Sequence, residues 1–219
     1  MRQVTAVVRN IVALGLMACC SAALAFDRNA LLDEANVLLL PRERGLPNLA
    51  LLDEQGQAFT TESLKDRWHL LFFGFTACPD VCPTTLSDMR GLLAQLPPDI
   101  RDQVQLILVS ADPKRDTPKA LRTYLSYYRA GFKGLTGEME QLQKLSKALG
   151  LPFVPAEDTA GNYSVSHSGN LAIVGPDGTL RGHIRAPFKL DGLKQALPQL
   201  VGPSDSSAHP GSMAVQRVR

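Results

Sequence analysis

Short apolar runs alternate with stretches of helical spacing through the middle of the chain. Residues 69–75 ("HLLFFGF") and 104–110 ("VQLILVS") are apolar without alternation, a pattern typical of strands that are covered on both faces. Residues 48–61 predict a hairpin, with its turn at Gln55-Gly56. The pattern therefore indicates a sheet with a buried centre and an additional hairpin near its start.

Helical spacing follows each of the two buried strands. Leucine and methionine recur at this spacing over residues 84–96, and the proline pair that comes next ends the predicted helix. In "ADPKRDTPKALRTYLSYY" (111–128), either Asp116 or Thr117 is expected to cap a second helix, which begins near Pro118. Strands that alternate with helices in this way favour a parallel sheet.

The last part of the pattern predicts a helix, a hairpin and a closing helix. The expected elements are a loop or short strand at 131–137, a helix at 138–149, hairpin strands at 171–174 and 179–185 around "GPDG", and a helix at 190–200. A strand–helix–strand unit followed by strand–turn–strand–helix is the thioredoxin arrangement. We therefore predict an α/β, thioredoxin-like fold with an N-terminal β-hairpin extension.

The first 25 residues have the pattern of an export signal. Arg2 and Arg9 precede an uncharged apolar run that ends in Ala23-Leu24-Ala25, and no twin arginine precedes this run. The "LMAC" sequence at 16–19 also resembles a lipoprotein cleavage box. Residues 1–25 are therefore expected to be a signal peptide or membrane anchor. The protein is expected to be exported and periplasmic, either free or held at the inner membrane by its N-terminus or a lipid.

Composition divides the rest of the chain and narrows the class of partner. We expect a mixed lead-in at 26–47, the thioredoxin-like domain at 48–201 and a disordered tail at 202–219. Arg2 and Arg9 belong to the leader, so 21 basic side chains balance 21 acidic ones in the remainder. A nucleic-acid partner would require a basic face, and this near-zero charge argues against one.

The cysteines provide the candidate chemistry. Cys19 and Cys20 lie in the leader, which leaves Cys78 and Cys82 as one pair at the predicted start of a helix. A single pair is too few for a disulfide scaffold, and the helix dipole favours thiolates there. Three intervening residues allow the pair to close a disulfide or to hold a metal ion. Two thiolates suit Cu(I), whereas a lasting Cu(II) site would also need an imidazole.

Four histidines could supply that imidazole. His69 opens a predicted strand and is expected to be a partly buried structural residue. His183 lies in the last predicted strand, where we expect it to be exposed, and His209 lies in the polar tail. His167 comes just before the strand that follows a long polar loop. In a thioredoxin fold this junction faces the cysteine helix, so His167 is the candidate third ligand.

Three stretches in family order resemble the Sco/SenC family of thioredoxin-like, copper-binding proteins: "FGFTACPDVCPTTL", "VSADPKRDTP" and "VSHSGNLAIVGPDG". The resemblance covers residues 49–200. It implies that Cys78 and Cys82 bind copper as Cu(I), and that His167 completes the site for Cu(II). It also implies export or membrane tethering. The implied partner is the cytochrome c oxidase subunit that carries CuA, or another periplasmic cuproprotein, which receives copper or has its thiols maintained.

The chain departs from the family pattern at two positions. Ser166 stands where the family usually has aspartate beside the histidine, and Gly175 replaces the first aspartate of a "DPDG" turn. Asp80 fits the family's cysteine loop, where its carboxylate would shape the loop or support the ligands from behind. An exposed turn residue is the alternative for Asp80. Asp116 is sufficiently explained by the start of a helix and is assigned no chemistry.

Several functions remain open at this point. A metallochaperone, which is not an enzyme, would bind copper reversibly at two thiolates and one imidazole. A thiol–disulfide oxidoreductase would cycle Cys78 and Cys82, with His167 either incidental or helping proton transfer. A thiol peroxidase would use Cys82 in "VCPTT" with a nearby arginine, which the sequence does not identify. A zinc site and a purely structural disulfide are the remaining alternatives.

Overall fold

The computed structural model describes residues 28–156 and 163–202. The strands are β1 (Val37–Gly45), β2 (Ala50–Asp53), β3 (Ala58–Thr60), β4 (Trp68–Gly74), β5 (Val104–Ser110), β6 (Lys133–Thr136), β7 (Phe153–Val154), β8 (Ser166–His167), β9 (Leu171–Val174) and β10 (Thr179–Ile184). The helices are α2 (Arg28–Glu34), α3 (Val81–Gln95), α4 (Pro98–Arg101), α5 (Pro118–Ser126), α6 (Met139–Leu149) and α7 (Leu190–Val201), with a short 3-10 helix, η1 (Thr61–Leu64). None of the described helices is both long and apolar enough to cross a membrane.

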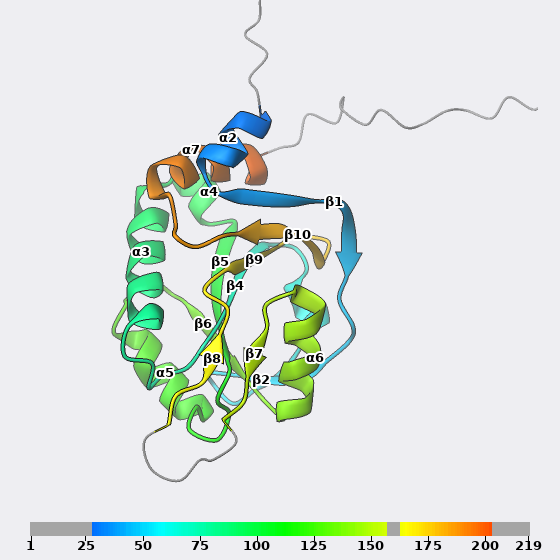
Figure 1. Ribbon diagram of the computed structural model, residues 1–219, viewed down its shortest axis with the longest axis vertical. Coiled ribbons are helices and arrows are strands. Elements are labelled where there is room, and N and C mark those ends of the chain that lie inside the picture. Colours follow the sequence, from blue (N-terminus) through cyan, green and yellow to red (C-terminus); the bar gives the residue numbers. More distant parts are fainter. Residues whose placement is uncertain (1–27, 157–162, 203–219) are drawn as a thin grey trace, which may run out of the picture. The chain divides into compact units, whose positions relative to one another are not determined.

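Eight strands form one mixed sheet in the order β1-β10-β9-β4-β5-β6-β2-β3 (Figure 1). β4, β5 and β6 run parallel, and β9 and β10 add antiparallel neighbours beside β4. The two central strands are buried along almost their whole length, as the continuous apolar runs predicted. This sheet, with helices on both faces, confirms the predicted thioredoxin-like α/β fold.

The predicted N-terminal hairpin is confirmed as β2 and β3. Gly56 occupies the turn with a positive φ of 80°, a conformation in which a side chain would be strained. β2 also pairs antiparallel with β6. The hairpin therefore continues the main sheet at one edge.

The sequence pattern missed a strand in the lead-in at 26–47. β1 lies in this segment and pairs antiparallel with β10 at the other edge of the sheet. Its second half, "PRERG", is polar and exposed, so the strand has no clear apolar alternation. A Cβ at Gly182 would overlap the carbonyl oxygen of Leu38, so glycine allows the close approach of the two strands. The domain boundaries themselves stay a prediction.

The predicted helices are present, with revised ends. α3 begins earlier than expected, at Val81, which places Cys82 in its first turn. Thr117 is the N-cap of α5, and its side chain accepts a hydrogen bond from the backbone N–H of Ala120. Asp116, the other candidate cap, is buried and bonded elsewhere. α5 ends at Ser126.

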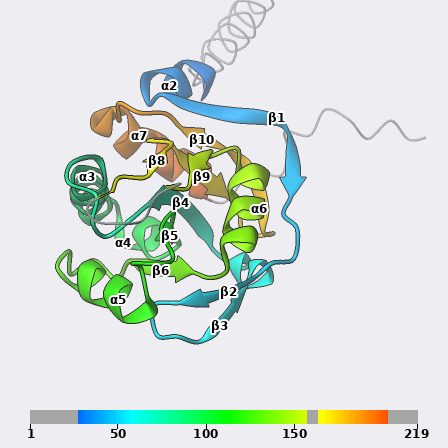
Figure 2. The ribbon, with the colours of Figure 1, turned by 60° about the horizontal axis from the view of Figure 1, so that its bottom comes forward.

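The helices divide between the two faces of the sheet (Figure 2). α3, α5 and α7 pack on one face and α6 packs on the other. Successive side chains of β4 alternate between these layers, so that Phe72 lies in the α3 layer and Phe73 in the α6 layer. Cys78 is partly buried against both layers, because it lies where the sheet ends between them. The predicted leader (1–25) and residues 203–219 of the predicted tail, including His209, lie outside the described residues.

Candidate metal centre

The cysteine pair lies where β4 ends and α3 begins, as predicted. The backbone N–H of Cys78 donates to the carbonyl oxygen of Phe75 (3.1 Å), which closes the loop after the strand. In the first turn of α3, the backbone N–H of Cys82 points at the Sγ atom of Cys78 at 3.5 Å. Cys78 is half-buried, Cys82 is fully buried, and both are free thiols.

His167 lies beside the cysteines although it is 85 residues beyond Cys82 in the chain. It lies on β8, paired with Phe153 of β7, and Figure 1 shows β8 between α3 and α6. Its Nε2 atom is 3.5 Å from the Sγ atom of Cys82, and its Nδ1 atom is 3.0 Å from the carbonyl oxygen of Ser168. That carbonyl can only accept a hydrogen bond. In the neutral ring Nδ1 therefore carries the proton, and Nε2 presents a lone pair to the sulfurs.

One ligand-forming atom from each of Cys78, Cys82 and His167 lies within 4.8 Å of the other two. In the part of the chain that the structure describes, this is the one group of three or more histidine, cysteine or acidic side chains placed so closely. Two sulfurs and one imidazole nitrogen suit Cu(I), and the nitrogen extends the set toward Cu(II). The donor chemistry therefore fits copper, and the structure brings together the three residues that the sequence singled out.

Burial sets the protonation of these groups. It raises the pKa of the Cys82 thiol well above its usual range. Burial also lowers the pKa of His167, an effect that the Ser168 carbonyl opposes. A metal ion that enters this site must therefore displace the Cys82 proton, whereas the imidazole is already neutral.

Gly74 makes room for the buried thiol, a role that the sequence reasoning missed. A Cβ at this position would lie 2.7 Å from the Cys82 Sγ atom and 3.0 Å from the Leu108 side chain. Real Cβ contacts of this length essentially do not occur. Glycine at the end of β4 therefore lets α3 approach the sheet closely enough to place the sulfur.

The buried carboxylate of Asp116 anchors the cysteine loop through hydrogen bonds. Asp116 accepts hydrogen bonds from the backbone N–H of Thr76 (3.1 Å), the Thr76 hydroxyl (2.6 Å) and the Ser110 hydroxyl (2.8 Å). Burial raises the pKa of Asp116, while the bonds from Thr76 and Ser110 act to lower it. The interpretation of Asp116 as a helix start alone was therefore wrong. Its spacing in the sequence resembles an N-cap, and only the fold brings Thr76 to it.

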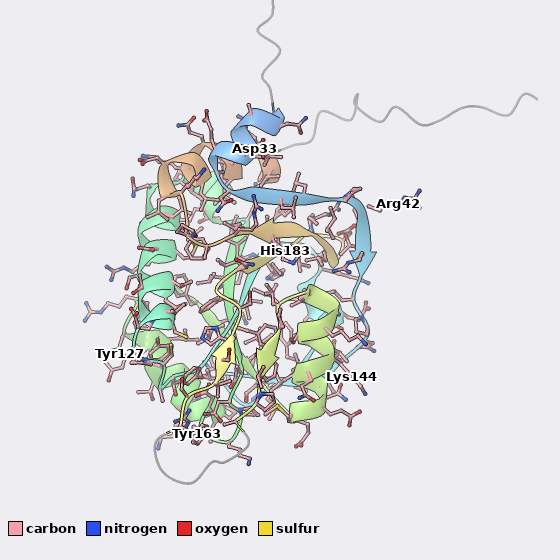
Figure 3. The ribbon with its side chains drawn as sticks, in the orientation of Figure 1. Asp33, Arg42, Tyr127, Lys144, Tyr163 and His183 are labelled. Atoms are coloured by element: carbon pink, nitrogen blue, oxygen red, sulfur yellow. The ribbon has the colours of Figure 1, made fainter. Side chains whose placement is uncertain are left out.

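Arg115 links the cysteine loop to the histidine segment. Its guanidinium carbon lies 5.4 Å from the ring centre of Phe75 and 3.7 Å from that of Tyr163. Its Nη1 atom donates to the carbonyl oxygen of Tyr163 (3.1 Å), and its Nε atom pairs with the Asp112 carboxylate. The Tyr163 hydroxyl donates to the same carboxylate (2.9 Å). We call Asp112, Arg115 and Tyr163 the Arg115 clasp; Figure 3 labels Tyr163 near the lower end of the view.

The histidine ring is also held by aromatic contacts. Phe72 and Phe75 meet it edge to face, with ring centres 5.6 Å and 5.8 Å away. Because the Arg115 guanidinium lies over Phe75, the clasp and the ring contacts form one continuous packing unit. This unit positions His167 relative to the cysteine loop.

The remaining candidate residues lie outside the trio. The Asp80 side chain is exposed, and within the described residues its carboxylate has no hydrogen bond to the three ligands. Its carbonyl oxygen accepts from the backbone N–H of Thr84, so Asp80 does shape the first turn of α3. A role for its carboxylate behind the ligands stays a prediction.

The two other described histidines are structural, with unexpected surroundings. His183, expected to be exposed, is half-buried, and its Nε2 atom donates to the Leu149 carbonyl oxygen at the end of α6 (2.7 Å). His69 is only 5% exposed, and neither ring nitrogen has a hydrogen-bond partner within the described ranges. Burial, with the nearby charges of Arg67 and Lys133, lowers the pKa of His69 to about 4.

Comparison with known proteins gives consistent relatives. The sequence profile of the SCO1/SenC family matches residues 42–201. A protein of Stutzerimonas stutzeri, described by its name as copper-binding, is 72% identical over 185 residues, covering 84% of this chain and 91% of that protein. A SCO2-like protein of Rickettsia conorii is 34% identical over 135 residues, covering 61% of this chain and 65% of its own length, slightly under two thirds.

A solved structure has the same architecture. The copper-bound structure of ScoI from Bradyrhizobium japonicum superposes with a TM-score of 0.60 at 30% sequence identity. The match covers 71% of this chain and 98% of that one. The two proteins therefore share the fold over most of this chain.

Proposed function

The chain belongs to the SCO1/SenC family, and from that premise we propose that it is a copper metallochaperone. Cys78 and Cys82 hold Cu(I), and His167 joins them to hold Cu(II). The observation that carries the proposal is the position of the His167 Nε2 atom, 3.5 Å from the Cys82 Sγ atom within a group of three donors. Copper in this reading is cargo, which arrives and leaves by exchange of ligands.

The donor set suits a carrier. Three protein ligands leave copper open to a further ligand, so a thiolate of a partner can bind the ion before the carrier releases it. The partner we propose is the cytochrome c oxidase subunit that carries CuA, or another periplasmic cuproprotein. The predicted leader supports a place of action outside the cytoplasm, in the periplasm or at the inner membrane.

An anaerobic copper titration tests the proposal. The reduced protein is expected to bind one Cu(I), and Cys78→Ser or Cys82→Ser is expected to weaken that binding at least about a hundredfold by removing a thiolate. His167→Ala is expected to retain Cu(I) and to lose Cu(II) together with its sulfur-to-copper charge-transfer absorption. His183→Ala is the matched control, because its ring bonds to Leu149 and lies outside the trio.

Two results would contradict this function. If His167→Ala and His183→Ala bind Cu(II) equally well, the imidazole is no ligand and the three-donor site is wrong. If the double cysteine variant still takes up Cu(I) at wild-type strength, copper binds elsewhere on the chain.

A thiol–disulfide oxidoreductase is the second candidate, and one observation favours it. Cys78 is half-buried at the start of a helix, whereas Cys82 is fully buried behind it. An accessible attacking thiol followed by a shielded resolving thiol is the arrangement that dithiol exchange needs. Rapid exchange with a small disulfide that persists in His167→Ala, without stoichiometric Cu(I) uptake, would favour this candidate.

Arg115 does not supply the positive charge that the thiol peroxidase alternative would need. Its guanidinium is paired with Asp112 and stacked on Tyr163, so its charge is already engaged. A peroxidase would need that charge to activate the reactive thiol.

A further inference from the structure

A second site lies on the α3 face of the sheet, away from the cysteines. It is a surface cavity of about 430 Å³ whose lining includes four arginines, Arg67, Arg90, Arg101 and Arg129. The buried side chains of Leu93 and Phe132 contribute to its apolar floor. The cavity therefore combines a concave apolar surface with a cluster of positively charged side chains.

This cavity is separate from the metal centre. Val104, one of its lining residues, starts β5 and is paired in register with Trp68 at the start of β4. The cysteines follow Gly74, at the opposite end of β4. Six residue steps along a strand span roughly 20 Å, so the two sites lie at opposite ends of the sheet.

The positive charge of the cavity is only partly balanced. Asp102 is the one acidic residue in the lining, and its Oδ1 atom is 3.3 Å from the Nε atom of Arg101. Arg67 donates to the backbone carbonyl oxygen of Asp102 (2.7 Å). The guanidinium groups of Arg90 and Arg129 have no hydrogen bond or ion pair with any residue in the described ranges. Two guanidinium groups are thus available to a ligand.

The backbone at Arg129 adds a second observation. Its φ is +48°, in the left-handed region that residues with a side chain rarely adopt. Gly131, close behind it, takes a φ of +65° without cost. The chain therefore turns at Arg129 in an unfavourable conformation while its side chain lines the cavity. Strained residues of this kind gather at binding sites more often than elsewhere.

We propose that this cavity, which we call the arginine pocket, binds an organic anion with a phosphate or carboxylate head and an apolar body. Guanidinium groups pair with these heads through two parallel hydrogen bonds, and the apolar floor would accept the rest of the molecule. The volume is that of a small-molecule site. The head could belong to an anionic phospholipid or to a soluble organic phosphate, because both present the same oxygens. This inference is independent of copper binding.

Calorimetric titration of the full chain tests the proposal with three probes. Inorganic phosphate presents the head alone, phenyl phosphate adds a compact apolar body, and monomeric dihexanoyl phosphatidic acid adds lipid chains. At least one of the two organic probes is expected to bind about tenfold more tightly than inorganic phosphate, because it also covers the floor. The stronger organic probe identifies the source as soluble or lipid.

Paired variants locate the binding. Arg90→Gln/Arg129→Gln is expected to weaken the better organic probe about tenfold, since it removes two charge-assisted contacts. Arg42→Gln/Arg185→Gln removes the same charge from exposed positions outside the pocket and is expected to stay within about twofold of wild type. Figure 3 shows the Arg42 side chain projecting away from β1. In nuclear magnetic resonance spectra, the amide of Gly131 is expected to shift and that of Cys78 to stay in place.

Three results would overturn the arginine pocket. The organic probes could bind no better than inorganic phosphate, which would show that the apolar floor of the pocket contributes nothing to binding. The two double variants could lose affinity equally, which would make the attraction one of net charge. The amide shifts could gather at Cys78 instead of Gly131, which would place the ligand at the other end of the sheet.

Discussion

The two segments that build the candidate metal centre are held in different ways. The cysteine loop is anchored by buried groups: Asp116 accepts three hydrogen bonds beneath it, and the absence of a Cβ at Gly74 admits the Cys82 sulfur. The histidine segment is held by the two-residue pairing of β7 with β8, by ring contacts and by the Arg115 clasp. Its neighbour Val154 is 62% exposed.

This difference suggests a division of labour. The sulfurs lie on a segment that hydrogen bonds to a buried carboxylate and close packing at Gly74 hold against the sheet, whereas the imidazole lies on a segment that a short strand pairing and side-chain stacking hold in place. A carrier can keep Cu(I) on the fixed thiolates while its imidazole joins or leaves. The following predictions test that comparison, from the largest expected change to the smallest.

Asp116→Ala should have the largest effect on stability. It leaves the Thr76 N–H and hydroxyl and the Ser110 hydroxyl without their acceptor, which should cost about 3 kcal/mol in the free energy of unfolding. Asp116→Asn retains an oxygen acceptor and should cost about 1 kcal/mol. Urea unfolding of the reduced, metal-free protein measures both. Equal losses in the two variants would contradict the anchoring role.

Gly74→Ala tests the close approach of Cys82 to the sheet. The added Cβ should destabilise the protein by about 2 kcal/mol through overpacking, and it should weaken Cu(I) binding because the sulfur must move. Gly91→Ala is the matched control: Gly91 lies in α3, an added Cβ there would meet nothing within 4 Å, and the change should be neutral or stabilising by up to about 1 kcal/mol. A Gly74→Ala protein as stable as wild type would show that the contact relaxes freely.

Arg115→Gln tests how the histidine segment is held. Loss of the clasp should lower the free energy of unfolding by about 1 to 2 kcal/mol, because Asp112 keeps only part of its bonding. Cu(II) binding should weaken several-fold while Cu(I) binding stays nearly unchanged, since only the imidazole is displaced. Arg122→Gln, an exposed change on α5, is the control. Equal loss of both copper forms would mean that the clasp supports the cysteines as well.

His69→Leu tests the stability of the sheet away from both segments. The pKa of His69 is lowered from 6.5 to about 4 in the folded protein. Between these two pH values the imidazole is protonated in the unfolded chain and neutral in the folded protein. Stability should therefore fall with pH in this window. Replacement by leucine should remove about 1 kcal/mol of the loss between pH 7 and 5.5. Unfolding curves at both pH values decide it, and an unchanged acid sensitivity would contradict the prediction.

Local patterns predicted the elements that carry the cysteines. The continuous apolar runs identified β4 and β5, because strands buried on both faces have no polar side to reveal. Helical spacing after the cysteines identified α3 and placed Cys78 and Cys82 at its start. β1 was missed because its polar half lies exposed at a sheet edge, where little burial shapes the sequence.

The amino-acid sequence by itself determined the order of the central elements and the cysteine pair on its helix, because these depend on periodicity and on residues near one another in the chain. It identified His167 as a candidate only through the expected fold and the family resemblance. The tertiary structure alone decided that Asp116 reaches Thr76, that Arg115 stacks on Tyr163 and that four arginines share a cavity. These contacts join residues far apart in the chain, and their partners follow from how strands align and helices pack. Local sequence patterns do not predict this alignment, because the energy that stabilises it comes from surfaces that meet only after folding.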